Sequence, residues 1–132
     1  MRIFIDTSAF FALLDRDDDN HKKAKKIWID LLDSENVLIT SNYVLVESVA
    51  LIQNRLGIEA VRGFHEDILP LINIEWINAG THKSGVSALL AASRRKLSLV
   101  DCVSFEIMRT LGIKTVFAFD PDFSEQGFQC IP

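Results

Sequence analysis

The chain has 132 residues, of which 48% are hydrophobic and 24% charged, so residues 1–132 are expected to form one domain with its own apolar core. This composition excludes an intrinsically disordered chain, and no apolar run reaches the ~18 residues that a membrane-spanning helix needs. We therefore expect a cytoplasmic protein with no membrane association. The net charge of −4 argues against a general basic nucleic-acid surface, unless several acids gather at one site and are neutralised by bound cations.

Short apolar segments alternate with segments of helical periodicity along the chain. The first of them, residues 2–5, predicts a short buried strand, and SAFFALL at 8–14 predicts a wholly apolar helix. The loop DRDDDN then leads into an amphipathic helix over 21–34. The remaining predicted elements are, in chain order, a strand at 37–40, a helix from Ser41 or Asn42 to Gly57, a helix at 58–69, a strand at 72–77, a helix at 81–95, a helix at 99–112, a strand at 115–119 and a strand at 128–131.

Each predicted strand is short and almost continuously apolar, which is typical of a parallel sheet covered by helices on both faces. The expected fold class is therefore α/β, a three-layer α/β/α arrangement around a central parallel sheet of four to five short strands. In open sheets of this kind, ligands bind in the crevice beyond the carboxyl ends of the strands.

Four acidic residues stand at that expected edge. Asp6 ends the first strand and Asp120 ends the fourth, in FAFDPDF. Asp101 falls in the first turn of the helix that contains SLVDCVSF, and Glu47 lies about a turn and a half into the helix after the second strand.

Each acid taken singly also has a structural interpretation. Asp6 can cap the helix that follows it, and Asp120 can cap a short helix that begins at Pro121. Asp101 can form a capping box with Ser98. Glu47 can form an ion pair with Arg55 or a lysine. Together, however, the four carboxylates can converge at the switch point of the sheet. Their mutual repulsion would raise some of their pKa values, and a site of oxygen ligands without His or Cys suits a hard divalent cation rather than zinc.

The segments IDTSAF, VLVES, SLVDCVSF and FAFDPDF, which span the chain in this order, resemble the PIN domain family, most closely the single-domain VapC-type toxin ribonucleases. The resemblance implies a parallel sheet between helices, Mg²⁺ or Mn²⁺ at a carboxylate cluster, and hydrolytic endonuclease cleavage of single-stranded RNA. It also implies the toxin of a toxin–antitoxin pair, with a small antitoxin as partner and a homodimer as assembly.

By the same resemblance, Asp6, Glu47, Asp101 and Asp120 are the catalytic, metal-binding acids. We expect Asp6 and Asp101 to be direct metal ligands and Glu47 to bind or orient the attacking water. Asp120 would complete a second metal position.

Small hydroxyl residues accompany these acids. Thr7 and Ser8 match residues that support the first acid, and Ser98 matches the hydroxyl that precedes the third. The tail also offers Asp122 as the fourth acid, and Asp120 is preferred because it directly follows the predicted strand.

A basic run, Arg94, Arg95 and Lys96, precedes the SLVD segment and, with Arg55, provides candidate contacts to RNA phosphates. An ordinary solvated helix end is an equally open interpretation of this run. The exposed-looking apolar residues Phe10, Phe11 and Trp28 suit either partner contacts or core packing.

Two other functions remain open at this point. The first is a non-catalytic PIN-like module that binds RNA or a protein without cleaving. The second is a receiver-type phosphoacceptor, which is the weaker hypothesis because receivers carry two adjacent acids after the first strand and here Asp6 is followed by Thr7.

Overall fold

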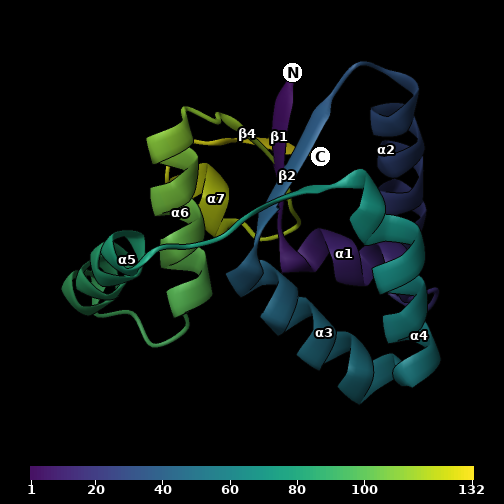
Figure 1. Cartoon of the computed structure of the whole chain (residues 1–132), viewed down its shortest axis with the longest axis horizontal. Coiled ribbons are helices and arrows are strands. Elements are labelled where there is room, and N and C mark those ends of the chain that lie inside the picture. Colours follow the sequence, from purple (N-terminus) through teal and green to yellow (C-terminus); the bar gives the residue numbers. More distant parts are fainter.

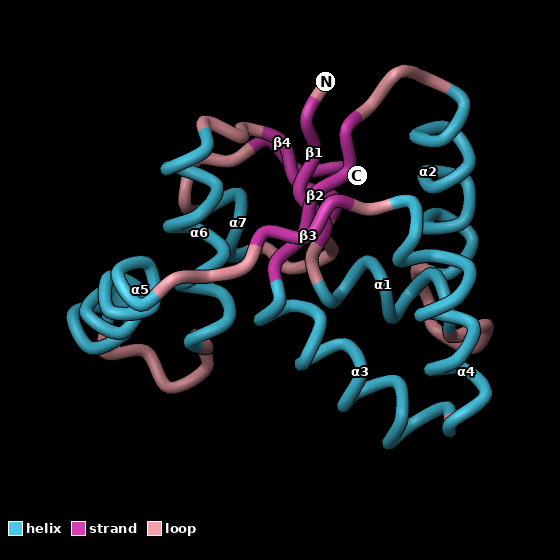
Figure 2. The backbone as a smooth tube through the Cα atoms, in the orientation of Figure 1, coloured by secondary structure: helices cyan, strands magenta, loops and turns pink.

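A sheet of five parallel strands, in the order β3-β2-β1-β4-β5, lies at the centre of the computed structural model, which describes residues 1–132 (Figure 2). The strands are β1 (Arg2–Ile5), β2 (Val37–Ser41), β3 (Asn73–Glu75), β4 (Thr115–Phe117) and β5 (Gln129–Ile131). The helices are α1 (Thr7–Leu14), α2 (His21–Asp33), α3 (Asn42–Leu56), α4 (Ile58–Gly63), α5 (Ala79–Ala92), α6 (Leu99–Leu111) and α7 (Asp122–Glu125).

Helices cover both sides of this sheet, with α5 and α6 on one side and α1, α2 and α4 on the other (Figure 1). The predicted fold class, a three-layer α/β/α arrangement with a parallel sheet, is confirmed. No helix combines the length and hydropathy that a membrane span requires.

The central strands are apolar throughout because helices exclude water from both of their faces. Ile3, Phe4 and Ile5 of β1 are at most 1% exposed, and all of β4 is buried. Phe10 is also a core residue, with its ring in an edge contact to Phe64 at a centroid separation of 5.0 Å. The interpretation of Phe10 as a partner contact is therefore wrong.

Several helix boundaries differ from the sequence prediction. The predicted helix at 58–69 is three segments: α4, a π-helical turn η1 (Phe64–Ile68) and a 3₁₀ turn η2 (Leu69–Leu71) before the next strand. The predicted helix at 81–95 ends instead at Ala92, because Ser93 adopts a left-handed conformation with φ of 53°. The basic run that follows Ser93 is therefore a connecting loop and not the end of a helix.

The fourth strand is shorter than predicted and ends at Phe117. Asp120 therefore does not directly follow the strand, and the prediction that it does, on which its preference over Asp122 was based, is wrong. Both acids lie at or beyond the loop that connects β4 with the short helix α7.

The chain switches direction across the sheet at β1, because β2 pairs with one side of this strand and β4 with the other. The carboxyl ends of β1 and β4 thus frame the switch point, where ligands bind in open α/β sheets. At this edge the Asp6 N–H donates to the Phe117 carbonyl at 3.1 Å, and the Asp6 carbonyl accepts from Ala9 and Phe10 in α1.

Helices α5 and α6 approach each other closely at Gly85. A Cβ at this position would lie 2.5 Å from Cγ2 of Val103 in α6. The glycine inside the helical pattern is thus explained by helix packing.

Candidate metal centre

Asp6 connects β1 to α1 and is the N-cap of that helix. Its Oδ2 accepts hydrogen bonds from the Ser8 N–H at 3.2 Å and the Ser8 hydroxyl at 2.6 Å. Although such bonds lower a carboxyl pKa, burial of this 4% exposed residue, with the nearby Asp101 and Asp120 carboxylates, raises the pKa of Asp6 to about 7. The cap role is confirmed, but it does not offset the cost of ionising this carboxyl.

Asp101 forms the predicted capping box with Ser98. The Asp101 N–H donates to Ser98 Oγ at 3.0 Å, and the Ser98 N–H donates to Asp101 Oδ2 at 3.2 Å. Burial, followed by the charges of Asp120 and Glu47, raises the pKa of Asp101 to about 6. Ser98 therefore fixes the position of this acid, as expected, at the first turn of α6.

Asp120 lies in the loop after β4, and Asp122 is the first residue of the short helix α7 that follows. Asp120 Oδ1 accepts a hydrogen bond from the Asp122 N–H at 2.9 Å, and burial and then Asp122 raise the pKa of Asp120. Single carboxylate oxygens of Asp101, Asp120 and Asp122 lie within 4.8 Å of one another, as the ligands of one metal ion do. The structure thus groups Asp122, which the sequence offered as an alternative to Asp120, with both Asp101 and Asp120.

Glu47 lies in the second turn of α3, half-buried, and close enough to Asp101 to raise the pKa of that acid. It forms no ion pair, so the predicted pairing with Arg55 is wrong. Arg55 lies eight residues further along α3, about 12 Å at the helical rise, with its guanidinium 5.7 Å from the Phe11 ring centroid. Arg55 forms no ion pair with any of the acids.

The four predicted acids share one electrostatic property: none of them forms an ion pair with a lysine or arginine. The ion pairs of the chain involve only Arg62, with Glu59 and Glu66, and Arg94, with Asp122 and Glu125. Buried carboxylates without a cation are costly. Because all available ligand atoms are oxygens, the group fits a hard divalent cation such as Mg²⁺ or Mn²⁺.

Hydroxyl groups join the elements that carry the acids. Besides its bond to Asp6, Ser8 Oγ accepts a hydrogen bond from the Phe119 N–H at 3.0 Å, which ties the loop after β4 to α1. Thr7 Oγ1 accepts from the buried Ser48 hydroxyl at 3.2 Å, which ties α1 to α3 beside Glu47. Ser48 was not among the residues predicted from sequence, although a serine next to Glu47 in an apolar helix is the signal that could have found it.

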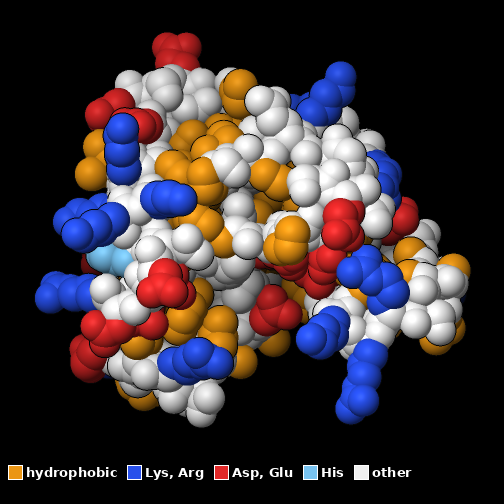
Figure 3. Space-filling model, turned by 180° about the vertical axis from the view of Figure 1, so that it is seen from behind, with side chains coloured by type: hydrophobic (Ala, Val, Ile, Leu, Met, Phe, Trp, Pro, Cys, Tyr) orange, Lys and Arg blue, Asp and Glu red, His pale blue; other side chains and the backbone are white.

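The basic run 94–96 lies in the loop between α5 and α6. Arg94 forms ion pairs with Asp122 at 3.1 Å and Glu125 at 3.5 Å, whereas Arg95 and Lys96 are exposed without one. In the view of Figure 3, basic side chains lie mostly toward the two sides of the molecule, with apolar atoms between them. RNA contacts by Arg94, Arg95, Lys96 and Arg55 stay a prediction.

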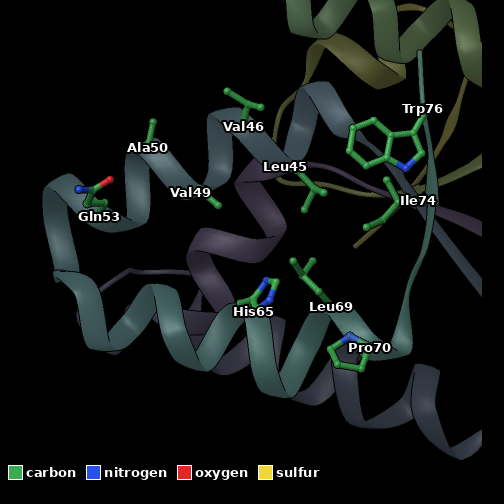
Figure 4. A pocket seen from close by; sticks show the side chains of 10 residues that line it. All are labelled: Leu45, Val46, Val49, Ala50, Gln53, His65, Leu69, Pro70, Ile74 and Trp76. Carbon is green, nitrogen blue, oxygen red and sulfur yellow. The ribbon is translucent and has the colours of Figure 1, made fainter. Parts of the chain in front are cut away.

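Two hollows adjoin helix α3. The smaller, of about 410 Å³, includes Glu47 itself and is lined by Asn42, Tyr43, Val46, Glu47, Ala50 and Val100. The larger, of about 780 Å³, is a mainly apolar groove (Figure 4): side chains of α3 face His65, Leu69 and Pro70, and Ile74 and Trp76 close one end. Trp76 and Val46 are 72% and 71% exposed, so this side of α3 presents apolar surface to solvent.

Comparisons with known proteins find matches over nearly the whole chain. The model of the PIN domain family matches residues 3–129. The 23S rRNA-specific endonuclease VapC20 of Mycobacterium tuberculosis is 35% identical over 127 residues, which cover 96% of this chain and 95% of the relative. The crystal structure of the M. tuberculosis VapC20, described as a sarcin–ricin loop cleaving toxin, superposes with a TM-score of 0.85 at 34% identity, covering 96% of this chain and 95% of that one.

A more distant structure shares the fold alone. FitAcB from Neisseria gonorrhoeae has a TM-score of 0.68 at 16% identity and covers all of this chain and 97% of its own. The matches over nearly the whole length confirm the family that the sequence motifs predicted.

Proposed function

Because this chain belongs to the PIN domain family, we propose that it is a metal-dependent endoribonuclease whose active site is the acidic edge of the sheet. The observation that carries the proposal is the set of four carboxylates, Asp6, Glu47, Asp101 and Asp120, none of which has a basic partner. Besides burial, the charges of Asp101 and Asp120 raise the pKa of Asp6, and those of Asp120 and Glu47 raise the pKa of Asp101. A hard divalent cation supplies the missing positive charge.

Asp6 and Asp101 are the proposed direct ligands of Mg²⁺ or Mn²⁺, and Asp120 completes a second position. When bound, such an ion supplies Lewis acidity, which makes water more acidic and offsets the charge that develops on a phosphodiester during hydrolysis. The residues of the chain fix the positions of the ligands. Ser8 and Ser98 hold Asp6 and Asp101 by hydrogen bonds, so neither carboxylate needs to move when the ion binds.

Glu47 is the proposed group that binds and orients the attacking water. It is half-buried and forms no ion pair, so its carboxylate is available to accept a proton or a hydrogen bond from water. Water, rather than a ribose hydroxyl, is the nucleophile in this scheme, so a preference for RNA must come from binding contacts.

The substrate we propose is RNA, and the first candidate is the sarcin–ricin loop of 23S rRNA, which the similar VapC20 cleaves according to its description. The hollow beside Glu47 supports binding of an unpaired base next to the acids. Tyr43 lines it and supplies an aromatic ring, with its hydroxyl bonded to His82. Unpaired bases stack on such rings.

We also propose that the chain is the toxin of a toxin–antitoxin pair and forms a homodimer. The apolar groove along α3, with the exposed Trp76, supports a surface that another protein chain covers. Size-exclusion chromatography with light scattering distinguishes a monomer from a dimer, and a monomer at micromolar concentration would contradict the dimer.

The activity is tested with purified protein, Mn²⁺ and two RNA hairpins, one with the sarcin–ricin loop sequence and one with a scrambled loop. We expect cleavage of the first RNA, and no cleavage by Asp6→Asn or in EDTA. Asp33→Asn, which changes an exposed acid at the end of α2, is the matched control and should cleave normally.

Each alternative outcome has a distinct meaning. Equal cleavage by Asp6→Asn would point to a contaminating nuclease and refute the proposed site. Retention of RNA without cleavage, and without stabilisation by Mn²⁺, would instead support the non-catalytic binding module.

A further inference from the structure

Arg94 connects the loop after α5 to the short helix α7 through two carboxylates. Its Nη2 lies 3.1 Å from Asp122 Oδ1, and its Nη1 lies 3.5 Å from Glu125 Oε2. These ion pairs span 28 and 31 residues of sequence. Of the basic run 94–96, only this residue contacts an acid.

Asp122 has a second set of neighbours on the side of the metal centre. One of its carboxylate oxygens lies within 4.8 Å of ligand atoms from Asp101 and Asp120, and its N–H donates to Asp120 Oδ1. Its side chain is 17% exposed, whereas that of Arg94 is 49% exposed. Asp122 is therefore shared between the guanidinium and the acidic cluster.

A guanidinium on a ligand carboxylate opposes the arrival of a second cation. It repels the incoming ion and withdraws part of the carboxylate's negative charge from it, and both effects act over the few ångströms that separate these groups. Because coupling between two bound cations is reciprocal, an ion that binds Asp122 also weakens the contact of Arg94.

We propose that Asp122 is a further metal ligand of this chain and that Arg94 is a built-in cation that competes with the divalent ion for it. The inference rests on the proposed metal-dependent function. In the ion-free chain Arg94 forms an ion pair with Asp122 and so offsets part of the negative charge of the acidic cluster. Arg94 thus keeps the affinity for the divalent ion lower than the acids alone would give.

The test is the affinity of the full-length chain for Mn²⁺, measured by isothermal titration calorimetry at about 0.15 M salt, where distant charges are screened. Arg94→Gln should bind Mn²⁺ about two- to fivefold more tightly than the wild type, the range expected for a partly exposed ion pair. Arg95→Gln removes the same charge from the adjacent exposed residue, which has no ion pair, and should bind almost as the wild type does.

Two further variants identify the mechanism. Asp122→Asn should weaken Mn²⁺ binding. Adding Arg94→Gln to this variant should not change its Mn²⁺ affinity further, because the carboxylate for which Arg94 and the ion compete is absent. Arg94→Lys keeps the positive charge and should bind close to the wild-type value.

The inference is overturned if Arg94→Gln binds Mn²⁺ as the wild type does or more weakly, or if Arg95→Gln gains as much affinity as Arg94→Gln. Such results would leave the proposed function intact. A wild-type chain that binds no Mn²⁺ would instead refute the metal centre itself, and with it this inference.

Discussion

The Ser8 hydroxyl donates a 2.6 Å hydrogen bond to the carboxylate of Asp6. The same oxygen accepts from the Phe119 N–H at 3.0 Å, so one side chain connects the first acid with the loop that carries Asp120. The position of both acids therefore depends on a residue that has no charge.

Ser8→Ala should lower the free energy of unfolding by about 1–3 kcal/mol, because the half-buried Phe119 N–H loses its partner. It should also weaken Mn²⁺ binding. Urea denaturation and calorimetric titration measure the two effects. Ser87→Ala, on the exposed face of α5, is the control and should change stability by less than about 0.5 kcal/mol. Unchanged stability of Ser8→Ala would contradict the structural role of this hydroxyl.

The stability of the metal-free chain should fall as the pH rises from about 4 to about 7. Burial first, and then the neighbouring acids, raise the pKa of Asp6 to about 7 and that of Asp101 to about 6, from 3.8. In this window the folded chain binds more protons than the unfolded chain, so the free energy of unfolding decreases with increasing pH. Urea denaturation in EDTA at pH 5 and pH 8 measures the difference.

Asp6→Asn is the matching variant, because an asparagine can still cap α1 but does not ionise. Its stability should fall less between pH 5 and pH 8, and at pH 8 in EDTA it should exceed that of the wild type. A wild-type stability that increases over this range, with no difference from Asp6→Asn, would contradict the raised pKa.

Mn²⁺ should raise the melting temperature of the wild type by several degrees and that of Asp101→Asn little or not at all. An ion that binds only the folded chain adds about 2.7 kcal/mol of stability at a hundred times its dissociation constant. Differential scanning fluorimetry measures both shifts. Asp33→Asn, which changes an exposed acid, should show the same Mn²⁺-induced increase in melting temperature as the wild type. An equal shift in Asp101→Asn would remove this acid from the proposed ligands.

Gly85→Ala should destabilise the chain by about 1–3 kcal/mol, because its Cβ would overlap the stiff Val103 side chain and force α5 and α6 apart. Since α6 carries Asp101, Mn²⁺ affinity should fall as well. The control is Gly80→Ala, in the exposed first turn of α5. A Cβ at Gly80 would meet only Asn78 Oδ1, at 3.4 Å, so this variant should not destabilise the chain. Thermal denaturation compares the two variants. Equal melting temperatures would contradict the prediction, because they would show that α5 and α6 can move apart without loss of stability.

The sheet and the positions of Asp6 and Asp101 at its edge could be predicted from sequence because local signals determine them. Continuous apolar strands between helices indicate a parallel sheet, and parallel strands bring the residues that follow them to one edge. Asp6 follows β1, and Asp101 is fixed by its capping box with Ser98, whereas Asp120 was expected directly after a strand that in fact ends at Phe117.

What sequence did not predict depends on contacts between distant segments. The pairing of Arg94 with Asp122 joins residues 28 positions apart, and no periodicity marks it. Both residues were candidates in the sequence, but their pairing became recognisable only once the left-handed Ser93 and the early end of β4 had placed the loop after α5 beside α7. The division of the predicted helix at 58–69 likewise depends on how η1 packs Phe64 and Ile68 into the core.

The backbone of Asp6 is hydrogen-bonded on both sides, to Phe117 through its N–H and to Ala9 and Phe10 through its carbonyl. Hydrogen exchange of such an amide requires opening of the central strands, which in a small domain occurs mainly by global unfolding. Mn²⁺ should therefore slow the hydrogen exchange of the Asp6 amide by the same factor as that of the most protected core amides. Exchange of the Arg95 amide, in the exposed loop, should change little. A cation that binds at this edge thus stabilises the whole sheet, and the acid cannot leave its position through a local fluctuation.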